Sequence, residues 1–242
     1  MFATFLHRGM AAGLLAGLLC GFFAFFLGEP VVDGAIQVEE ATAADHQMEA
    51  SANHGHEEIF SRSTQKVGLL FATSLFGVTV GGIFGMVYAY FRSRLLSNSE
   101  WSRSLSLTSA AFFGVFLIPF LKYPANPPGV GSPETIGSRT TEYFAMVTLS
   151  LVVVVSTWYV ARELRARGMS TPVRQLVVAL GSVVVIGVLY SALPAGPDPG
   201  EFPAGLLWDF RLSSLGTQVI FWAGLGVIFG FLNERYARKA ST

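Results

Sequence analysis

The sequence contains one cysteine and few charged residues. Cys20 lies alone within an apolar run, which excludes an intramolecular disulfide and a cysteine-based metal cluster within one chain. Only 13% of the 242 residues are charged, whereas 52% are hydrophobic and the mean hydropathy is +0.52. These values are typical of a membrane protein and not of a soluble domain.

Catalytic motifs are also missing from the sequence. It has no Walker sequence GxxxxGK[ST], no HExxH and no GxSxG, so we expect no enzyme and no resident cofactor. Energy for any transport must then come from an ion gradient, the membrane potential or another protein. We expect the chain to lie in the lipid bilayer and to bind no nucleic acid.

Long apolar runs dominate what is present. Six of them approach the roughly 20 residues that a helix needs to cross a bilayer. They are Gly9–Leu27, Val67–Phe91, Leu105–Leu121, Thr140–Val160, Val173–Leu193 and Leu215–Leu232. Arg8 precedes the first run, as in a signal peptide, but five more runs follow and no clear cleavage site is present. We therefore predict an all-α, polytopic membrane protein with six transmembrane helices.

The distribution of lysine and arginine predicts the orientation. If the N-terminus is cytoplasmic, most basic residues lie inside and most acidic residues lie outside. The inside set is Arg8, Arg92, Arg94, Arg103, Arg162, Arg165, Arg167, Arg174, Arg235, Arg238 and Lys239. Both termini are then cytoplasmic, in a single integral membrane domain that covers residues 1–242.

Two of the external connections are long. Gly28–Lys66 is acidic and poor in large apolar residues, so it cannot bury a core and is expected to be a flexible loop. Lys122–Arg139 reads KYPANPPGVGSPETIGSR, with four prolines and three glycines that exclude a helix over most of its length. This second segment is expected to be a shaped loop.

Glycines recur at a four-residue spacing in the first two apolar runs. The first has Gly9, Gly13, Gly17 and Gly21, and the second has Gly77, Gly81 and Gly85 beside Gly82. Small residues let helix backbones approach closely in lipid. We therefore predict that the first two helices pack together through these glycines.

Histidines and acids cluster in the first external loop. Imidazole suits Co²⁺, Ni²⁺, Cu²⁺ and Zn²⁺, and neighbouring carboxylates add negative charge. The predicted ligands are His46, His54, His56, Glu57 and Glu58. The spacing favours a weak, exchangeable site, and a solvated acidic linker that contains histidines by chance is an equal alternative.

The second loop is the predicted entrance. Its candidate residues are Lys122, Pro124, Asn126, Pro127, Pro128, Arg139 and Glu142. Proline fixes φ near −65°, so the segment loses little entropy on ordering and can roof an external opening. A stiff connector between the third and fourth helices is the alternative. Glu142 is either a transport ligand or the interfacial ion-pair partner of Arg139.

Three stretches together resemble the CbtA-type family of predicted cobalt transporter subunits. The most specific is KYPANPPGVGSPETIGSRT, Lys122–Thr140. The others are HGHEEIFSRSTQKVGLLFATSLFGVTVGGIFG, His54–Gly85, and WDFRLSSLGTQVIFWAGLGVIFGFLNER, Trp208–Arg235.

The resemblance implies a multi-pass subunit in a bacterial cytoplasmic (inner) membrane. Its function would be the uptake of cobalt, as transported substrate, for cobalamin synthesis. A small one-helix, histidine-bearing partner of the CbtB type would accompany it. The alternative is a membrane scaffold or metal-sensing interaction protein without a transport path of its own.

Overall fold

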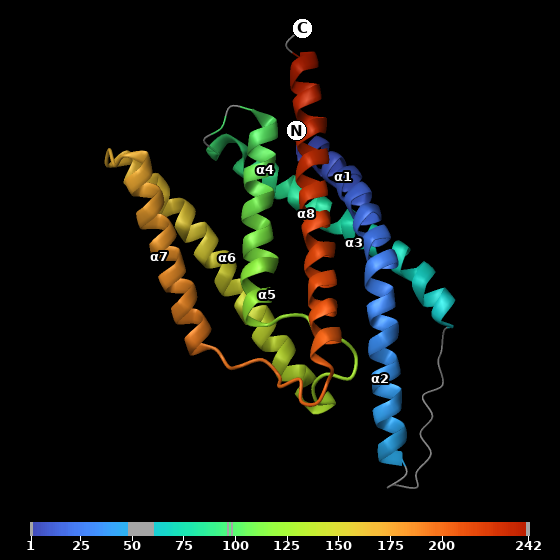
Figure 1. Ribbon diagram of the computed structural model, residues 1–242. Coiled ribbons are helices and arrows are strands. Elements are labelled where there is room, and N and C mark those ends of the chain that lie inside the picture. The colour runs from blue at the N-terminus through green and yellow to red at the C-terminus, as the bar shows by residue number, and fades with distance from the viewer. Residues whose placement is uncertain (1, 48–60, 96, 98, 241–242) are drawn as a thin grey trace. The chain divides into compact units, whose positions relative to one another are not determined.

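The structure, a computed structural model, describes residues 2–47, 61–95, 97 and 99–240. It is 87% helical, and the described residues form no strand. The principal helices are α1 (Phe2–Phe23), α2 (Glu29–Gln47), α3 (Arg62–Phe91), α4 (Glu100–Ala111), α5 (Ile118–Lys122), α6 (Ile136–Ala166), α7 (Thr171–Ala192) and α8 (Ala204–Ala240) (Figure 1).

Six helical segments of the described chain are long and apolar enough to cross a membrane. They are Phe2–Thr42, Arg62–Arg94, Glu100–Lys122, Ile136–Ala166, Thr171–Ala192 and Ala204–Lys239. Each contains all or nearly all of one predicted apolar run, so the prediction of an all-α, polytopic membrane protein with six spans is confirmed. The side of the membrane that the termini face stays a prediction.

The chain forms two compact units. Unit 1 comprises residues 1–109, 126–130 and 200–242, and unit 2 comprises residues 110–125 and 131–199. The third span therefore begins in unit 1 and ends in unit 2. Whether both units act as one integral membrane domain stays a prediction.

Unit 1 is built on the contact between α1 and α3. A Cβ added at Gly77 would overlap the carbonyl oxygen of Gly13 and lie 3.0 Å from the Cα of Gly17. A Cβ added at Gly9 would overlap the oxygen of Gly81. The helices run antiparallel with their backbones in contact, which confirms the predicted packing of the first two spans through glycine.

Helix α8 completes the core of unit 1. The Cβ of Ala16 on α1 lies where it would contact a side chain at Gly224 of α8. Near one end, Phe5, Phe84, Tyr88 and Phe229 form a cluster of four aromatic rings, with centroids of Tyr88 and Phe229 4.9 Å apart. Residues from three helices therefore share one buried apolar centre.

The first span continues beyond the predicted apolar run. After α1, a π-helical turn at Ala24–Gly28 leads directly into α2, and the helix changes direction there (Figure 1). Pro30 explains the turn, because a proline lacks the N–H and clashes with the carbonyl four residues earlier. The prediction of a flexible loop over residues 28–66 is therefore wrong for Glu29–Gln47, which is helical, and for Arg62–Lys66, which begins α3.

The third span also contains a π-helical turn next to a proline. A π-helical turn at Phe112–Leu117 precedes Pro119 by two residues. Within unit 2, Gly114 of this turn lies beside Leu151 and Val154 of α6, and the Ser150 hydroxyl donates a hydrogen bond to the Gly114 oxygen. The wider turn thus provides a carbonyl that a neighbouring helix uses.

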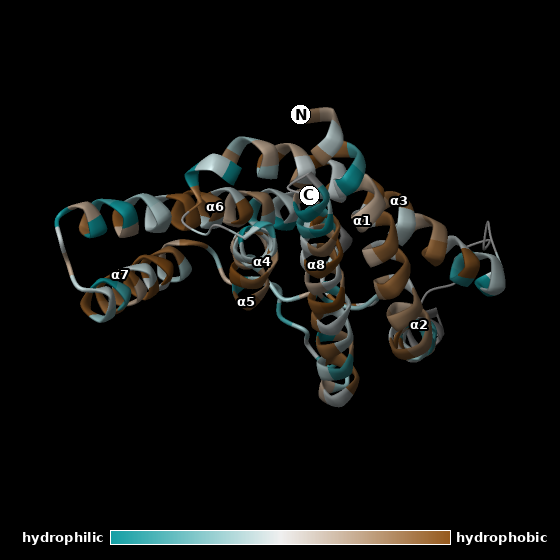
Figure 2. Cartoon of the chain, turned by 90° about the horizontal axis from the view of Figure 1, so that it is seen from above, coloured by the Kyte–Doolittle hydropathy of each residue, from teal (hydrophilic) through white to brown (hydrophobic). Residues whose placement is uncertain are grey.

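Unit 2 also contains the hairpin of α6 and α7. The hydroxyls of Thr157 and Ser182 lie 2.8 Å apart between the two helices. No residue of α7 is buried, and apolar side chains such as Leu180 and Val183 are about two-thirds exposed. In Figure 2 the hydrophobic residues run along the helices and hydrophilic residues gather near helix ends, as expected for helices that face lipid.

Candidate functional site

A groove lies in unit 1 beside the first π-helical turn. Its volume is about 150 Å³. The lining residues are Ala24, Gly28, Glu29, Val32, Leu69, Phe210, Ser213, Ser214 and Thr217, from the first helical span, α3 and α8. One carboxylate and three hydroxyl-bearing residues thus line a mainly apolar space. The sequence analysis did not identify any of these residues as functional. The only sequence feature that pointed to the site was Glu29, an acidic residue next to Pro30 within the first helical segment.

Glu29 belongs to a network of four charged residues between α2 and α3. Its Oε2 accepts a hydrogen bond of 2.8 Å from Nη2 of Arg62. Asp33 accepts from Nε and Nη2 of the same guanidinium, at 3.1 and 2.5 Å, and from Nζ of Lys66 at 2.6 Å. Arg62 is therefore held mainly by Asp33, and Glu29 contributes one bond.

The tip of the predicted entrance loop belongs to the same unit. Residues 126–130 form a turn in which Val130 N donates to Pro127 O at 3.3 Å. Gly129 has φ +81°, which suits the third position of a type II turn after proline. Asn126 Oδ1 accepts a 3.0 Å hydrogen bond from Arg211 of α8, and Gly129 lies against Glu39 of α2. Pro127 is buried, whereas Pro128 is exposed.

The remaining entrance residues lie in unit 2. Nζ of Lys122 donates to the carbonyl oxygens of Tyr190 and Leu193 at 2.8 and 3.1 Å, so it caps the end of α7. Arg139 donates to the oxygen of Ser132 at 3.1 Å and covers Gly131.

Pro124 and Glu142 are half-buried in unit 2. Tyr123 donates to Pro194 O at 2.9 Å, and burial together with the Glu142 carboxylate raises the pKa of Tyr123. The sequence thus predicted a shaped loop, but its seven candidate residues are divided between two units.

The predicted metal ligands are largely outside the described residues. His54, His56, Glu57 and Glu58 are not described, and His46 lies near the end of α2. In the described part of the chain, no group of three or more histidine, cysteine, aspartate or glutamate side chains is arranged to hold a metal ion. The histidine site stays a prediction.

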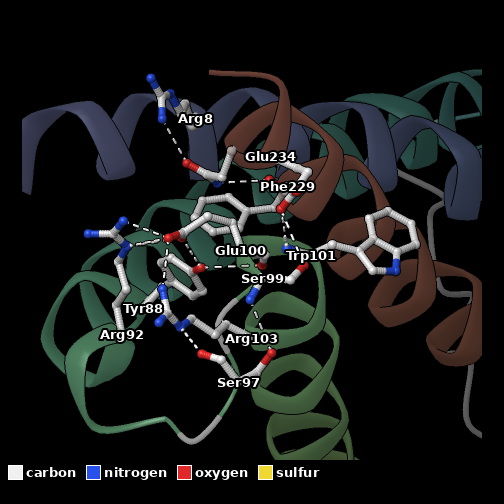
Figure 3. Close-up of polar contacts among 11 residues, drawn as sticks. Arg8, Tyr88, Arg92, Ser97, Ser99, Glu100, Trp101, Arg103, Phe229 and Glu234 are labelled. Carbon is white, nitrogen blue, oxygen red and sulfur yellow. Dashed lines mark hydrogen bonds and ion pairs between the residues drawn. The ribbon is translucent and has the colours of Figure 1, made fainter. Parts of the chain in front are cut away.

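A buried carboxylate lies at the other end of unit 1 (Figure 3). Glu100, at the start of α4, is 6% exposed. It accepts hydrogen bonds from Tyr88 at 2.5 Å, from Nε and Nη2 of Arg92 at 2.6–2.9 Å, and from Nη1 of Arg103 at 2.9 Å. Two guanidiniums and a phenol thus satisfy a carboxylate that would be costly to bury alone.

Other side chains join the remaining helices to this end. Glu234 of α8 accepts from the backbone N–H of Trp101 at 3.3 Å, which places a negative charge at the N-terminus of α4. Arg8 of α1 donates to Asn233 of α8 at 2.8 Å and lies over the ring of Tyr236. The ends of α1, α3, α4 and α8 therefore meet here, and the start of α1 and the end of α8 lie on the same side of unit 1 (Figure 1).

The chain was also compared with known proteins. The profile of the CbtA family, described as probable cobalt transporter subunit, matches residues 2–234. No curated protein and no solved structure matches the chain. The family match spans nearly all of the chain, including five of the six apolar helical segments in full and the sixth up to residue 234. The chain therefore belongs to the CbtA family of probable cobalt transporter subunits.

Proposed function

We propose that the protein is the integral membrane subunit of a system that takes up divalent transition metal, chiefly Co²⁺, for cobalamin synthesis in a bacterial cell. The family match over residues 2–234 carries this proposal. The family description as a subunit implies a partner in a complex. The partner that we propose is a small one-helix, histidine-bearing protein of the CbtB type, in the cytoplasmic (inner) membrane.

The proposed path begins at the acidic side of unit 1. Helix α2 carries Glu39 and Glu40 and leads toward the histidine segment, where His46, His54, His56, Glu57 and Glu58 are the proposed capture ligands. Glu39 also lies against Gly129 at the tip of the Pro/Gly loop. Acidic residues and the loop tip are therefore neighbours, which suits an entrance for cations.

Replacement of the histidines is expected to reduce metal uptake. In metal-starved bacterial cells that express the chain with its small partner, His54→Ala/His56→Ala should lower Co²⁺ accumulation about tenfold, because the capture ligands are lost. Accumulation is measured by elemental analysis at equal protein in the membrane. His7→Ala, which changes an exposed histidine on α1, is the matched control and should leave uptake unchanged. Equal uptake by the His54/His56 variant and the unmodified chain would show that these histidines are linker residues.

The loop prolines provide a second test. Pro127→Ala/Pro128→Ala should reduce Co²⁺ uptake several-fold, by about 3-fold or more, because the docked turn loses the residues that pre-set its backbone. The amount of protein in the membrane should not change. Pro197→Ala, in the connection between α7 and α8, is the control. Normal uptake in the double variant would mean that the loop only connects helices.

A scaffold or metal-sensing protein is the second candidate. It is favoured by how the hydroxyls of α3 are used: Thr73, Ser74 and Thr79 all donate to carbonyls of their own helix. Such hydroxyls add little to a polar path. The two functions differ in whether the protein itself moves metal across a bilayer.

A further inference from the structure

The groove beside the π-helical turn has oxygen donors that the fold does not use. Glu29 Oε1 accepts no hydrogen bond from a described residue, since its only such bond is from Arg62 to Oε2. The hydroxyl of Ser214, within α8, likewise makes no side-chain hydrogen bond to a described residue. Ser213 donates weakly to the Leu27 oxygen at 3.4 Å, and Thr217 donates to the Ser213 oxygen at 2.8 Å, which leaves their lone pairs available.

We propose that this groove binds a divalent cation, partly hydrated, through the Glu29 carboxylate and the hydroxyl oxygens of Ser213, Ser214 and Thr217. The inference rests on the proposed function, for which it supplies a second, intramembrane site. A volume of about 150 Å³ accommodates a cation with several of its waters. Oxygen ligands and retained water are the coordination that hard divalent cations accept.

The charges around the groove favour a cation that binds weakly. Glu29 brings negative charge to a lining that is otherwise neutral, and Val32, Leu69 and Phe210 provide apolar walls that strengthen its attraction for a cation. Arg62 is not part of the lining and keeps both of its bonds to Asp33 if Glu29 turns to a metal ion. The charges of Glu29, Asp33, Arg62 and Lys66 cancel, so the ion can also leave, as a transport route requires.

The ligand set also predicts poor selectivity. Hydroxyl and carboxylate oxygens do not distinguish Co²⁺ from Mn²⁺ as strongly as imidazole does. Selection for Co²⁺ then belongs to the histidine segment, and the groove passes on what that segment has captured. Excess Mn²⁺ should therefore displace Co²⁺ from the groove.

The test is equilibrium dialysis of radioactive Co²⁺ against the purified full-length chain in mild detergent. The background variant is His46→Ala/His54→Ala/His56→Ala/Glu57→Gln/Glu58→Gln, so that none of the proposed capture ligands contributes. We expect saturable Co²⁺ binding that excess Mn²⁺ displaces. Glu29→Gln should weaken it about tenfold, and Ser214→Ala should weaken it by about 3-fold, because each removes an oxygen ligand or its charge.

Asp33→Asn is the matched control, since Asp33 shares Arg62 with Glu29 but does not line the groove. It should bind Co²⁺ within about twofold of the background, even though it disturbs the ion-pair network more. Thermal unfolding of each variant confirms that it is folded. The proposal is overturned if the background shows no saturable binding, if Mn²⁺ does not compete, or if Glu29→Gln and Asp33→Asn weaken binding equally.

Uptake in cells separates this site from the proposed function. If His54→Ala/His56→Ala blocks uptake but the background protein binds no Co²⁺, the uptake function stands and the groove site is refuted. If the groove binds Co²⁺ as expected while the intact chain and its partner give no uptake, the site stands as a binding site and the uptake function is refuted.

Discussion

Gly77→Ala should destabilise the protein severely, whereas Gly68→Ala on the same helix should stabilise it slightly. A methyl group at Gly77 would overlap the Gly13 carbonyl oxygen and approach the Gly17 Cα, and backbone cannot move aside as a side chain can. We expect a loss of about 3 kcal/mol, the upper part of the range for overpacking. At Gly68 no atom lies within 4 Å of the added Cβ. There the change should stabilise the helix by about 0.5–1 kcal/mol, because alanine is the better helix former.

Both variants carry the same chemical change on α3, but the expected changes in unfolding free energy have opposite signs. The comparison therefore separates the effect of the backbone contact from the effect of helix propensity. The measurement is reversible unfolding in mild detergent, with gel filtration to show that the folded species is unchanged in size. If Gly77→Ala and Gly68→Ala unfold alike, α1 and α3 do not touch through their backbones. The core of unit 1 as described would then be incorrect.

Glu100→Gln should cost of order 3 kcal/mol of unfolding free energy. The substitution keeps the volume but removes the charge that both Arg92 and Arg103 face, and it leaves two guanidiniums without a counter-charge. Their side chains remain 30% and 18% exposed, so partial hydration limits the loss. Tyr88→Phe, which removes one hydrogen bond to the same carboxylate, should cost about 1.5–3 kcal/mol.

Glu163→Gln on α6 is the matched control for the loss of charge. Glu163 pairs with Arg167 at 2.9 Å, but the two side chains are 60% and 70% exposed. An exposed pair of this kind contributes less than about 1 kcal/mol. Equal stability losses at Glu163 and Glu100 would mean that the Glu100 cluster is a surface feature and does not join the helix ends.

The six spans and the glycine contact were predictable because each depends on a repeated pattern. An apolar run near 20 residues long has few alternatives to a membrane helix. In each of the two helices, glycines at a four-residue spacing form a smooth face, as Gly13 does in the first and Gly77 in the second. In lipid, two such faces let the helix backbones approach closely and gain van der Waals contacts. The pairing of the first two spans was predicted because both helices carry such a row of glycines.

The continuation of the first helix was not predictable from composition. Glu29–Gln47 is acidic and poor in large apolar residues, which is the pattern of a disordered segment. It is nevertheless helical, since α1 nucleates it and Asp33 and Glu29 bind Arg62 of α3. The two π-helical turns were also missed, although Pro30 and Pro119 inside helical runs were a usable indication of a local irregularity.

The Glu100 cluster was missed because charges were counted by side of the membrane and not as pairs. Under the predicted topology Glu100, Glu163 and Glu234 are the acids among many cytoplasmic arginines. Each of the three pairs with an arginine in the structure. A rare acid in a basic environment is therefore a sequence feature that points to an ion pair, but only the fold shows that Glu100 is buried.

The measurement that tests the central claim most directly is Co²⁺ flux into vesicles that contain the purified chain, alone and with its small histidine-bearing partner. A dye trapped inside reports the metal, and protein-free vesicles give the background rate. We expect flux above background that depends on the chain and falls in Glu29→Gln but not in Asp33→Asn. Background flux in both preparations, with folded and inserted protein, would contradict a transport path and would favour the scaffold or metal-sensing function.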